Sequence, residues 1–420
     1  MPDIAAALAR RQAYDRKVVA RAVTADPAIA RAPGWVMRLV LAADLYIFDR
    51  PVPGVADGRS VIAGYPWFGD WGRDTFIALP GLTLAVGEPQ RCGEVLAAAR
   101  PFVRAGLLPN VFGRTPADSH YGSADAALWY ALCVQRWHDA GAATAAVRAE
   151  FGPVLQQMAT AYLQGTDLGL RVDDDGLLCA GSRAHNATWM DAQTGSGPVT
   201  PRDGQPVEIA ALWCALLQHL AELCAGDWPA RASAAGAAFV RAFWRDDARC
   251  LFDRRHDGRG DPALRPNMVI AAALPRSPLS PAQRQGVVDT AVRELLTPRG
   301  LRTLAPGDAA YRGRYEGGPE QRDLAYHQGT AWPWLGGFFV EASLRAAAPA
   351  QRATVRARLL AWLQGFTAAV DRGGGDHLAE VFDGDAPQRP GGTFAQAWNT
   401  GELLRALALC SADVATGVQP

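Results

Sequence analysis

The sequence alternates between helical segments and two contrasting kinds of loop, and this alternation limits the fold more than any other feature. Residues 205–224 form the clearest helical segment, because Ile209, Leu212 and Leu216 begin an apolar stripe with helical spacing. About twelve such segments are expected from this periodicity, at residues 34–49, 73–86, 88–104, 122–139, 144–165, 205–224, 229–245, 266–274, 281–296, 327–346, 350–369 and 394–411.

The loops between these segments alternate in character. Short plain loops, such as residues 86–88 and 140–142, are followed by long loops rich in Trp, Tyr, Asp, Arg and Gly. The six rich loops precede every second helix and are residues 50–72, 105–121, 166–204, 246–265, 297–326 and 370–393. Six helical hairpins with all their elaborate loops at one end describe an (α/α)6 toroid, in which the inner helices start at the functional face.

We therefore predict an all-α (α/α)6 toroid with short β-hairpins in its loops; an irregular helical bundle is the alternative. The clearest hairpin is expected at residues 170–179, around the turn Asp175-Gly176. Residues 1–33 are expected to form an N-terminal helical arm or linker, and residues 34–420 the toroid domain.

Charge and cysteine usage exclude several classes of function. Lys plus Arg and Asp plus Glu both number 42, so the basic surplus that nucleic-acid binders need is missing. Lys17 is the only lysine, which excludes a Schiff base or a phosphate-loop lysine later in the chain. The seven cysteines include no CxxC pair, and no apolar run reaches the roughly 18 residues of a membrane span. We expect a soluble, cytoplasmic protein without nucleic-acid or membrane partners.

The first rich loop has the composition of a carbohydrate site. Trp67, Asp70, Trp71, Arg73 and Asp74 lie within eight residues of one another. Aromatic faces pack on the C–H faces of sugars, while Arg and Asp make directional hydrogen bonds to hydroxyl groups. The alternative is that Asp70 caps the following helix and the tryptophans belong to the core, which would leave Arg73 and Asp74 unexplained.

Two later loops supply candidate carboxyl groups for hydrolysis of a glycosidic bond. Such hydrolysis needs one protonated and one ionised carboxyl group on either side of the scissile oxygen. Asp191 follows Trp189 and Met190 in the third rich loop, and apolar neighbours of this kind could raise its pKa. Glu380 lies between Ala379 and Val381 in the sixth loop. Both are the candidate catalytic residues.

Further polar and aromatic residues are candidate substrate contacts rather than metal ligands. His327 has Ala331 at the i+4 position, where a metal-binding helix would carry a second ligand. Residues 173–176 suggest a calcium loop but lack the spacing to a bidentate Glu, so a solvated turn is favoured. Glu208 could cap a helix or contact substrate. No metal or organic cofactor is expected, and the remaining substrate-binding candidates are Trp189, Glu208, His327, Gln328 and Trp332.

These motifs, taken in order, resemble the C-terminal amylo-α-1,6-glucosidase domain of glycogen debranching enzymes, which is related to glucoamylases. The resemblance covers residues 34–411 and rests on several segments. These are GYPWFGDWGRDTFIAL at 64–79, LPN at 108–110, TWMD at 188–191, residues 200–213, RPN at 265–267, SPLS at 277–280, YRGRYEGG at 311–318, YHQGTAWPW at 326–334, EVFDG at 380–384 and AQAW at 395–398.

The resemblance implies an (α/α)6 glycoside hydrolase that releases glucose from α-1,6 branch stubs of glycogen-like glucans. It implies that Asp191 is the general acid, that Glu380 is the general base, and that Arg73 and Asp74 bind the terminal glucose. Relatives often carry Arg where this chain has Val111, and they carry an N-terminal β-rich domain where only about 33 residues precede the match here.

Three other functions are compatible with parts of this pattern. A related toroid hydrolase could cleave another α-glucoside linkage. A toroid phosphorylase would not need Glu380, because phosphate would replace the base and the water. A non-catalytic carbohydrate-binding toroid would be expected to lose one of the two carboxyl groups, and both are present. Loops half a ring apart favour inversion, with a carboxyl separation of about 6.5–9.5 Å.

Overall fold

Six helices form a closed inner ring within residues 3–180, 186–372 and 374–411, the part of the chain that the computed structural model describes. Each inner helix packs against the next, and the last packs against the first, which confirms the (α/α)6 toroid. They are α3 (Gly72–Leu82), α5 (Ala126–Asp139), α8 (Val207–Leu223), α10 (Asn267–Ala273), α13 (Leu335–Ala346) and α16 (Ala397–Ser411). The first two residues of the predicted arm and the last nine of the predicted toroid domain lie outside the described residues.

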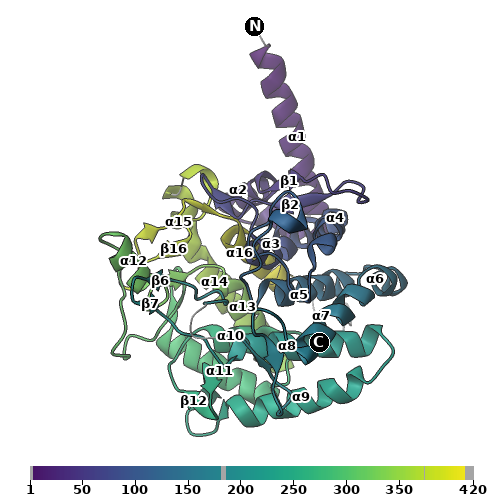
Figure 1. Ribbon diagram of the computed structural model, residues 1–420. Coiled ribbons are helices and arrows are strands. Elements are labelled where there is room, and N and C mark those ends of the chain that lie inside the picture. Colours follow the sequence, from purple (N-terminus) through teal and green to yellow (C-terminus); the bar gives the residue numbers. More distant parts are fainter. Residues whose placement is uncertain (1–2, 181–185, 373, 412–420) are drawn as a thin grey trace.

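Outer helices alternate with the inner ones along the chain and surround them (Figure 1). Each outer helix buries one face only. In the helix over residues 89–99, for example, the buried side chains Cys92, Val95, Leu96 and Ala99 recur at helical spacing. By contrast, α3 is buried at every position, as an element enclosed on all sides must be. The outer helices are α2 (Gly34–Leu45), α4 (Pro89–Ala99), α7 (Gly152–Gln164), α9 (Trp228–Phe243), α11 (Pro281–Glu294) and α14 (Arg352–Leu363).

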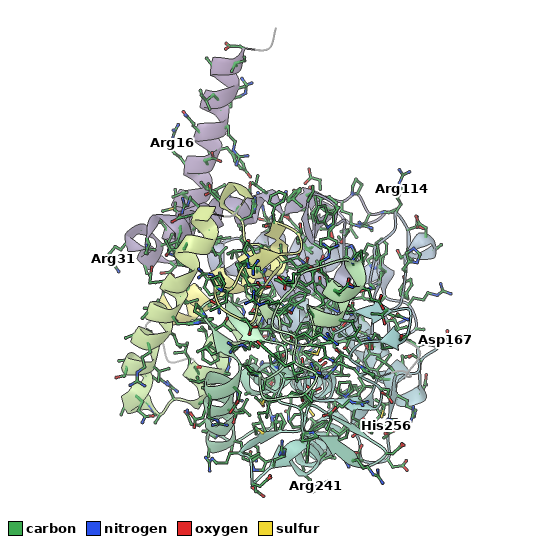
Figure 2. The ribbon with its side chains drawn as sticks, turned by 90° about the vertical axis from the view of Figure 1, so that its left-hand side faces the viewer. Arg16, Arg31, Arg114, Asp167, Arg241 and His256 are labelled. Carbon is green, nitrogen blue, oxygen red and sulfur yellow. The ribbon has the colours of Figure 1, made fainter. Side chains whose placement is uncertain are left out.

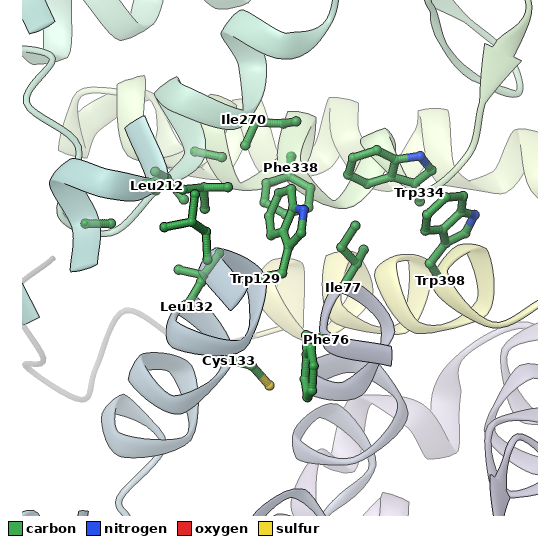
Figure 3. Close-up of a cluster of buried hydrophobic side chains, with 14 of the residues drawn as sticks. Phe76, Ile77, Trp129, Leu132, Cys133, Leu212, Ile270, Trp334, Phe338 and Trp398 are labelled. Carbon is green, nitrogen blue, oxygen red and sulfur yellow. The ribbon is translucent and has the colours of Figure 1, made fainter. Parts of the chain in front are cut away.

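The centre of the toroid is filled by large side chains from all six inner helices (Figure 3). Trp129 of α5 packs edge-to-face on Trp334 and on Phe338 of α13, with ring centroids 6.2 and 5.6 Å apart. Trp334 in turn stacks on Trp398 of α16 at 5.4 Å. Tryptophan rings bury a large apolar area at fixed geometry, so this cluster fixes how the inner helices sit against one another.

The rich loops gather at one end of the toroid, at the left of Figure 1, and Figure 2 looks onto that end. They hold short antiparallel strands, and the predicted hairpin is confirmed as β4 (Arg171–Val172) and β5 (Leu178–Cys179). The fifth and sixth loops form a five-stranded sheet of β13 (Leu296–Thr297), β14 (Gly300–Arg302), β15 (Ala331–Trp332), β16 (Val381–Phe382) and β17 (Pro390–Gly391).

Other short strands tie neighbouring loops together. The pair β3 (Gly64–Tyr65) and β18 (Ala395–Gln396) joins the first loop to the last. The rest are β1 (Ile47–Asp49) with β2 (Arg59–Val61), β6 (Gln193–Thr194) with β7 (Gly197–Pro198), β9 (Trp244–Arg245) with β10 (Cys250–Leu251), and β8 (Gln205–Pro206) with β11 (Arg254–His256) and β12 (Arg259–Asp261).

The prediction of one helix over 327–346 was wrong in its first part. A short helix, α12 (Pro319–Tyr326), ends just before it, and α13 begins only at Leu335. Gly329 has φ +149°, and a Cβ there would lie 2.5 Å from the carbonyl oxygen of Arg312. Pro333 also lacks a backbone donor for a helix. The segment between the two helices therefore forms the strand β15.

Two other predicted helices are each divided in two. Residues 144–165 form α6 (Thr144–Glu150) and α7, which meet at Phe151. Residues 350–369 form α14 and the start of α15 (Thr367–Arg372). Such breaks at helix ends are poorly marked in sequence, because one apolar stripe runs across both parts.

The N-terminal helix α1 (Ile4–Ala25) projects from the body of the toroid (Figure 1). Its C-terminal half packs on α2 and buries Val18 and Ala22. Near its start, Ile4 and Leu8 are 78% and 56% exposed, so the first turns gain nothing from packing on the toroid. Within the described residues, no helix combines the length and apolar character needed to cross a membrane.

Candidate active site

Arg73 occupies the first turn of α3 and lies among several carboxyl groups. Gly72 precedes it because a Cβ there would lie 2.2 Å from the carbonyl oxygen of Pro109 in the second loop. The Arg73 guanidinium donates from Nε to both carboxylate oxygens of Asp125, at 2.9 Å each, and from Nη1 to Oδ2 of Asp191 at 2.8 Å. A planar fork of donors thus fixes the first loop to the second and third.

Asp191 is the most accessible of these carboxyl groups, with 35% of its side chain exposed. Enclosure in the protein raises its pKa, but the guanidinium of Arg73 and the imidazole of His327 outweigh that effect, so its pKa lies below the ordinary value. The apolar neighbours in sequence suggested the opposite direction. The prediction was wrong because the charged partners come from other loops and cannot be seen in the local sequence.

Glu380 is only 5% exposed and is held on both carboxylate oxygens. Tyr326 donates its hydroxyl to Oε1, and the backbone N–H of Thr393 donates to Oε2 at 3.0 Å. Asn399 also donates to the backbone carbonyl of Glu380 at 3.0 Å. Burial raises the pKa of Glu380 above its ordinary value, and the two donors to its carboxylate only partly oppose this.

Asp74, the neighbour of Arg73, is a fourth carboxyl group in the same cluster. Its Oδ1 accepts a hydrogen bond from Nε2 of Gln396 at 2.8 Å. Burial raises its pKa to about 8 against the opposing effect of Arg73, and the nearby charges of Glu380 and Asp191 raise it further. Asp74 is therefore protonated at neutral pH and can donate a hydrogen bond as well as accept one.

Glu208 lies beneath the third loop and is completely buried. Arg202 binds it through two nitrogens and also binds Asp253. Asp253 accepts from Asn267, whose Oδ1 accepts from the indole of Trp189 at 2.7 Å. This ion pair is a third arrangement that neither the capping nor the substrate-contact interpretation of Glu208 had predicted.

The aromatic candidates divide into exposed and buried residues. Trp67 is 66% exposed, and Trp71 is half-buried beside Phe68 at the rim. Trp189 and Trp332 are each 1% exposed, and both contact the ring of His327.

The remaining polar candidates are anchored to neighbouring loops. Asp70 forms an ion pair with Arg50, and Gln328 accepts from Arg265 at 2.6 Å. The role of each candidate in substrate binding stays a prediction.

Sequence reasoning missed three residues of this cluster: Asp125, Tyr326 and Gln396. Asp125 and Gln396 lie at the starts of inner helices, where rich loops end, and that position was the available signal. Tyr326 directly precedes His327 and was quoted only as part of a motif. Within the described residues, no group of three or more His, Cys, Asp or Glu side chains is placed to hold a metal ion.

A model of one protein family matches almost the whole toroid. It is described as amylo-alpha-1,6-glucosidase and matches residues 41–405. The chain belongs to this family. Members of the amylo-alpha-1,6-glucosidase family are glycoside hydrolases, so the substrate class is carbohydrate.

Comparison with individual proteins agrees with this placement. The glycogen debranching enzyme of Saccharomyces cerevisiae is 25% identical over 390 residues, an alignment that covers 67% of this chain and 25% of the yeast protein. The chain thus matches about a quarter of the length of that relative.

Solved structures share the fold at low sequence identity. A GH63 mannosylglycerate hydrolase from Thermus thermophilus, in complex with glucose, is 14% identical with a TM-score of 0.62, covering 90% of this chain and 99% of that one. A rhamnosidase from Klebsiella oxytoca is 14% identical with a TM-score of 0.54, covering 89% of this chain and 63% of that one. At such identity these likenesses show the toroid fold alone.

Proposed function

We propose that this protein is an amylo-α-1,6-glucosidase that releases glucose from α-1,6 branch stubs of glycogen-like glucans with inversion at the anomeric carbon. The observation that carries the proposal is the pair Asp191 and Glu380, placed by different loops at the open end of a toroid of this family. The two carboxyl groups have different surroundings, as an acid and a base must.

In the proposed reaction Asp191 protonates the leaving glycosidic oxygen, and Glu380 removes a proton from the attacking water. Arg73 and Asp74 would hold the hydroxyl groups of the terminal glucose. Glu380 is buried and held by two donors, so its carboxylate cannot rotate freely, which suits a base that must aim a water molecule.

The acid must gain a proton before it can act. Arg73 and His327 keep the pKa of Asp191 low in the free protein, so its carboxyl is ionised at neutral pH. A bound sugar would replace water around the exposed third of this side chain, and desolvation favours the protonated form. Substrate binding should therefore be coupled to proton uptake by Asp191.

The test is glucose release by the purified protein from isomaltose, panose, maltose and a limit dextrin. Release from isomaltose, panose and the limit dextrin, with little from maltose, supports the proposal, and activity should survive EDTA. Faster release from maltose would indicate an α-glucosidase of another linkage specificity. Binding of these glucans without any release would indicate a carbohydrate-binding toroid.

A further inference from the structure

Two consecutive residues at the end of α12 face the two candidate catalytic carboxyl groups, one each. The hydroxyl of Tyr326 donates to Oε1 of Glu380. Nε2 of His327 faces Oδ1 of Asp191 at 3.8 Å, slightly beyond hydrogen-bond distance. Arg73 donates to Oδ2 of the same aspartate, so His327 faces the carboxylate oxygen that Arg73 does not bind.

The ring of His327 is fixed although it makes no hydrogen bond. It is fully buried, and it stacks on Trp332 with ring centroids 5.3 Å apart and planes at 17°. Trp189 contacts it edge-on at 5.2 Å, and the ring of Tyr326 lies at 4.8 Å. Neither ring nitrogen has a hydrogen-bond partner among the residues that the structure describes.

An orphaned imidazole at this place needs an explanation. Leaving buried polar atoms unpaired is costly, and an apolar ring of similar shape would avoid that cost. A neutral imidazole carries one donor and one acceptor, so it can donate to an ionised carboxylate or accept from a protonated one. That is the property needed beside a carboxyl group that changes its protonation state during a reaction.

We propose that Tyr326 and His327 act as one positioning unit, which holds Glu380 as the ionised partner and orients Oδ1 of Asp191 toward the glycosidic oxygen. The assignment rests on the proposed function of the two carboxyl groups. The two residues are consecutive and their rings lie 4.8 Å apart, so one short segment of the chain faces both carboxyl groups.

Other titratable groups also face this site. Asp191 is faced by Arg73, and the carboxyl groups of Asp74 and Glu380 lie close enough to interact with it. Arg265 and Arg73 both act on His327 and, with burial, keep its pKa below the ordinary value in spite of Asp191. The imidazole is therefore neutral near pH 7, and its interaction with Asp191 is that of a dipole rather than a full charge.

The experiment uses two ring-conserving variants with matched controls. Tyr326→Phe removes only the hydroxyl that binds Glu380, and Tyr311→Phe removes a hydroxyl that binds Asp385 at 2.9 Å in the same pair of loops. His327→Phe removes both orphaned nitrogens. Its control is His219→Phe, another buried histidine, whose Nδ1 is also without a partner in the described chain.

Two readouts separate positioning from a structural role. In Tyr326→Phe the acidic limb of the pH profile of kcat/KM should move up by about one pH unit. Glu380 loses a hydrogen-bond donor in this variant, and a carboxylate that loses a donor holds its proton more tightly. His327→Phe should shift the basic limb upward instead, since Asp191 loses a group that favours its ionised form. His327→Gln, whose longer side chain restores a donor at the position of Nε2, should move that limb back, and both controls should keep the wild-type profile.

Carbon-13 NMR titration of labelled Asp and Glu carboxyl groups, assigned with Asp191→Asn and Glu380→Gln, gives the same information without substrate. A higher Glu380 pKa in Tyr326→Phe and a higher Asp191 pKa in His327→Phe support the unit even if the wild-type protein hydrolyses none of the tested glucans, in which case only the proposed function fails. Unchanged carboxyl titrations in both variants would overturn the inference. Equal loss of thermal stability in the variants and their controls, with unmoved pH limbs, would likewise reduce the pair to a structural element.

Discussion

Two of the clusters of charged side chains that the toroid buries are built in opposite ways. Farther along the inner helices, an inner ion-pair cluster consists of Arg136, Glu341, Glu402 and Arg405. Arg405 binds Glu402 through two nitrogens at 2.6 and 2.8 Å, and it binds Glu341 at 2.6 Å. Arg136 adds a contact to Glu341 at 3.0 Å. Arg345 also binds Glu341 at 2.9 Å, so the arginines outnumber the glutamates. Their charges more than offset the effect of burial and lower the pKa of Glu341 to about 2.

The open-end cluster consists of Arg73, Asp74, Asp125, Asp191 and Glu380, and its carboxyl groups outnumber its arginine. Burial accordingly raises the pKa of Asp74 to about 8 and also raises that of Glu380, while Asp191, which Arg73 binds, moves the other way. In the inner cluster the glutamates are paired with arginines, whereas in the open-end cluster several carboxyl groups share one arginine and therefore differ in proton affinity. Carboxyl groups held with different proton affinities are typical of acid–base sites.

The largest expected effect is on catalysis at the open end. Asp191→Asn or Glu380→Gln should lower kcat by about 10²–10⁴-fold, the usual contribution of a positioned acid or base. Glu380→Gln should hold or raise stability, because the folded pKa of Glu380 is raised, whereas Asp191→Asn should lower it, because the ionised Asp191 is paired with Arg73. Steady-state kinetics and thermal unfolding of the same preparations measure both. Activity close to wild type in either variant would remove that residue from the chemistry.

A substitution in the inner ion-pair cluster should lower stability and leave kcat unchanged. Glu341→Gln leaves Arg405 and Arg136 under-compensated, and breaking a buried pair in this way costs about 3–5 kcal/mol of stability. The folded fraction should keep the wild-type kcat. Asp227→Asn, which removes an exposed pair with Arg231, is the control and should cost no more than about 1 kcal/mol. A kcat loss without a stability loss in Glu341→Gln would contradict the division between the clusters.

Arg73→Lys tests whether the ion pairs of the open-end cluster are needed for catalysis. Lysine offers a point charge instead of a planar fork, so it cannot bind Asp125 and Asp191 together. Loss of one charge-assisted hydrogen bond predicts a fall in kcat/KM of about 10–100-fold. Kinetic measurement beside an Arg50→Lys variant, whose arginine binds Asp70 at the rim, shows whether the effect is specific. A wild-type value for Arg73→Lys would remove Arg73 from the site.

The last expected effect is a difference in the pH dependence of stability. The folded pKa of Asp74 is raised, so wild-type stability is lost as pH rises from about 4 toward about 8. Asp74→Asn should therefore become more stable relative to wild type over that range. The folded pKa of Glu341 is lowered, so the cost of Glu341→Gln should shrink as pH falls from about 4.5 toward 2. Denaturant unfolding across pH would contradict the comparison if both variants changed in the same direction.

The toroid could be predicted from the sequence because helical periodicity and the alternation of loops are local signals. Unusual clusters of polar and aromatic residues in the rich loops also made Arg73, Asp191 and Glu380 candidates, and the structure brings Arg73 and Asp191 into contact; their roles stay predictions. The five-stranded sheet could not be predicted, because its strands supply two or three residues each from distant positions. The direction of the Asp191 pKa shift was equally hidden, since Arg73 lies 118 residues away in the chain.

The central claim is that Asp191 and Glu380 act from opposite faces of the sugar, with a water molecule between the base and the anomeric carbon. In that case no covalent glucosyl intermediate forms, and the configuration at the anomeric carbon inverts. Proton NMR of the first glucose released from isomaltose or panose, recorded before mutarotation, tests this directly. We expect β-glucose as the initial product, and initial release of α-glucose would contradict inversion.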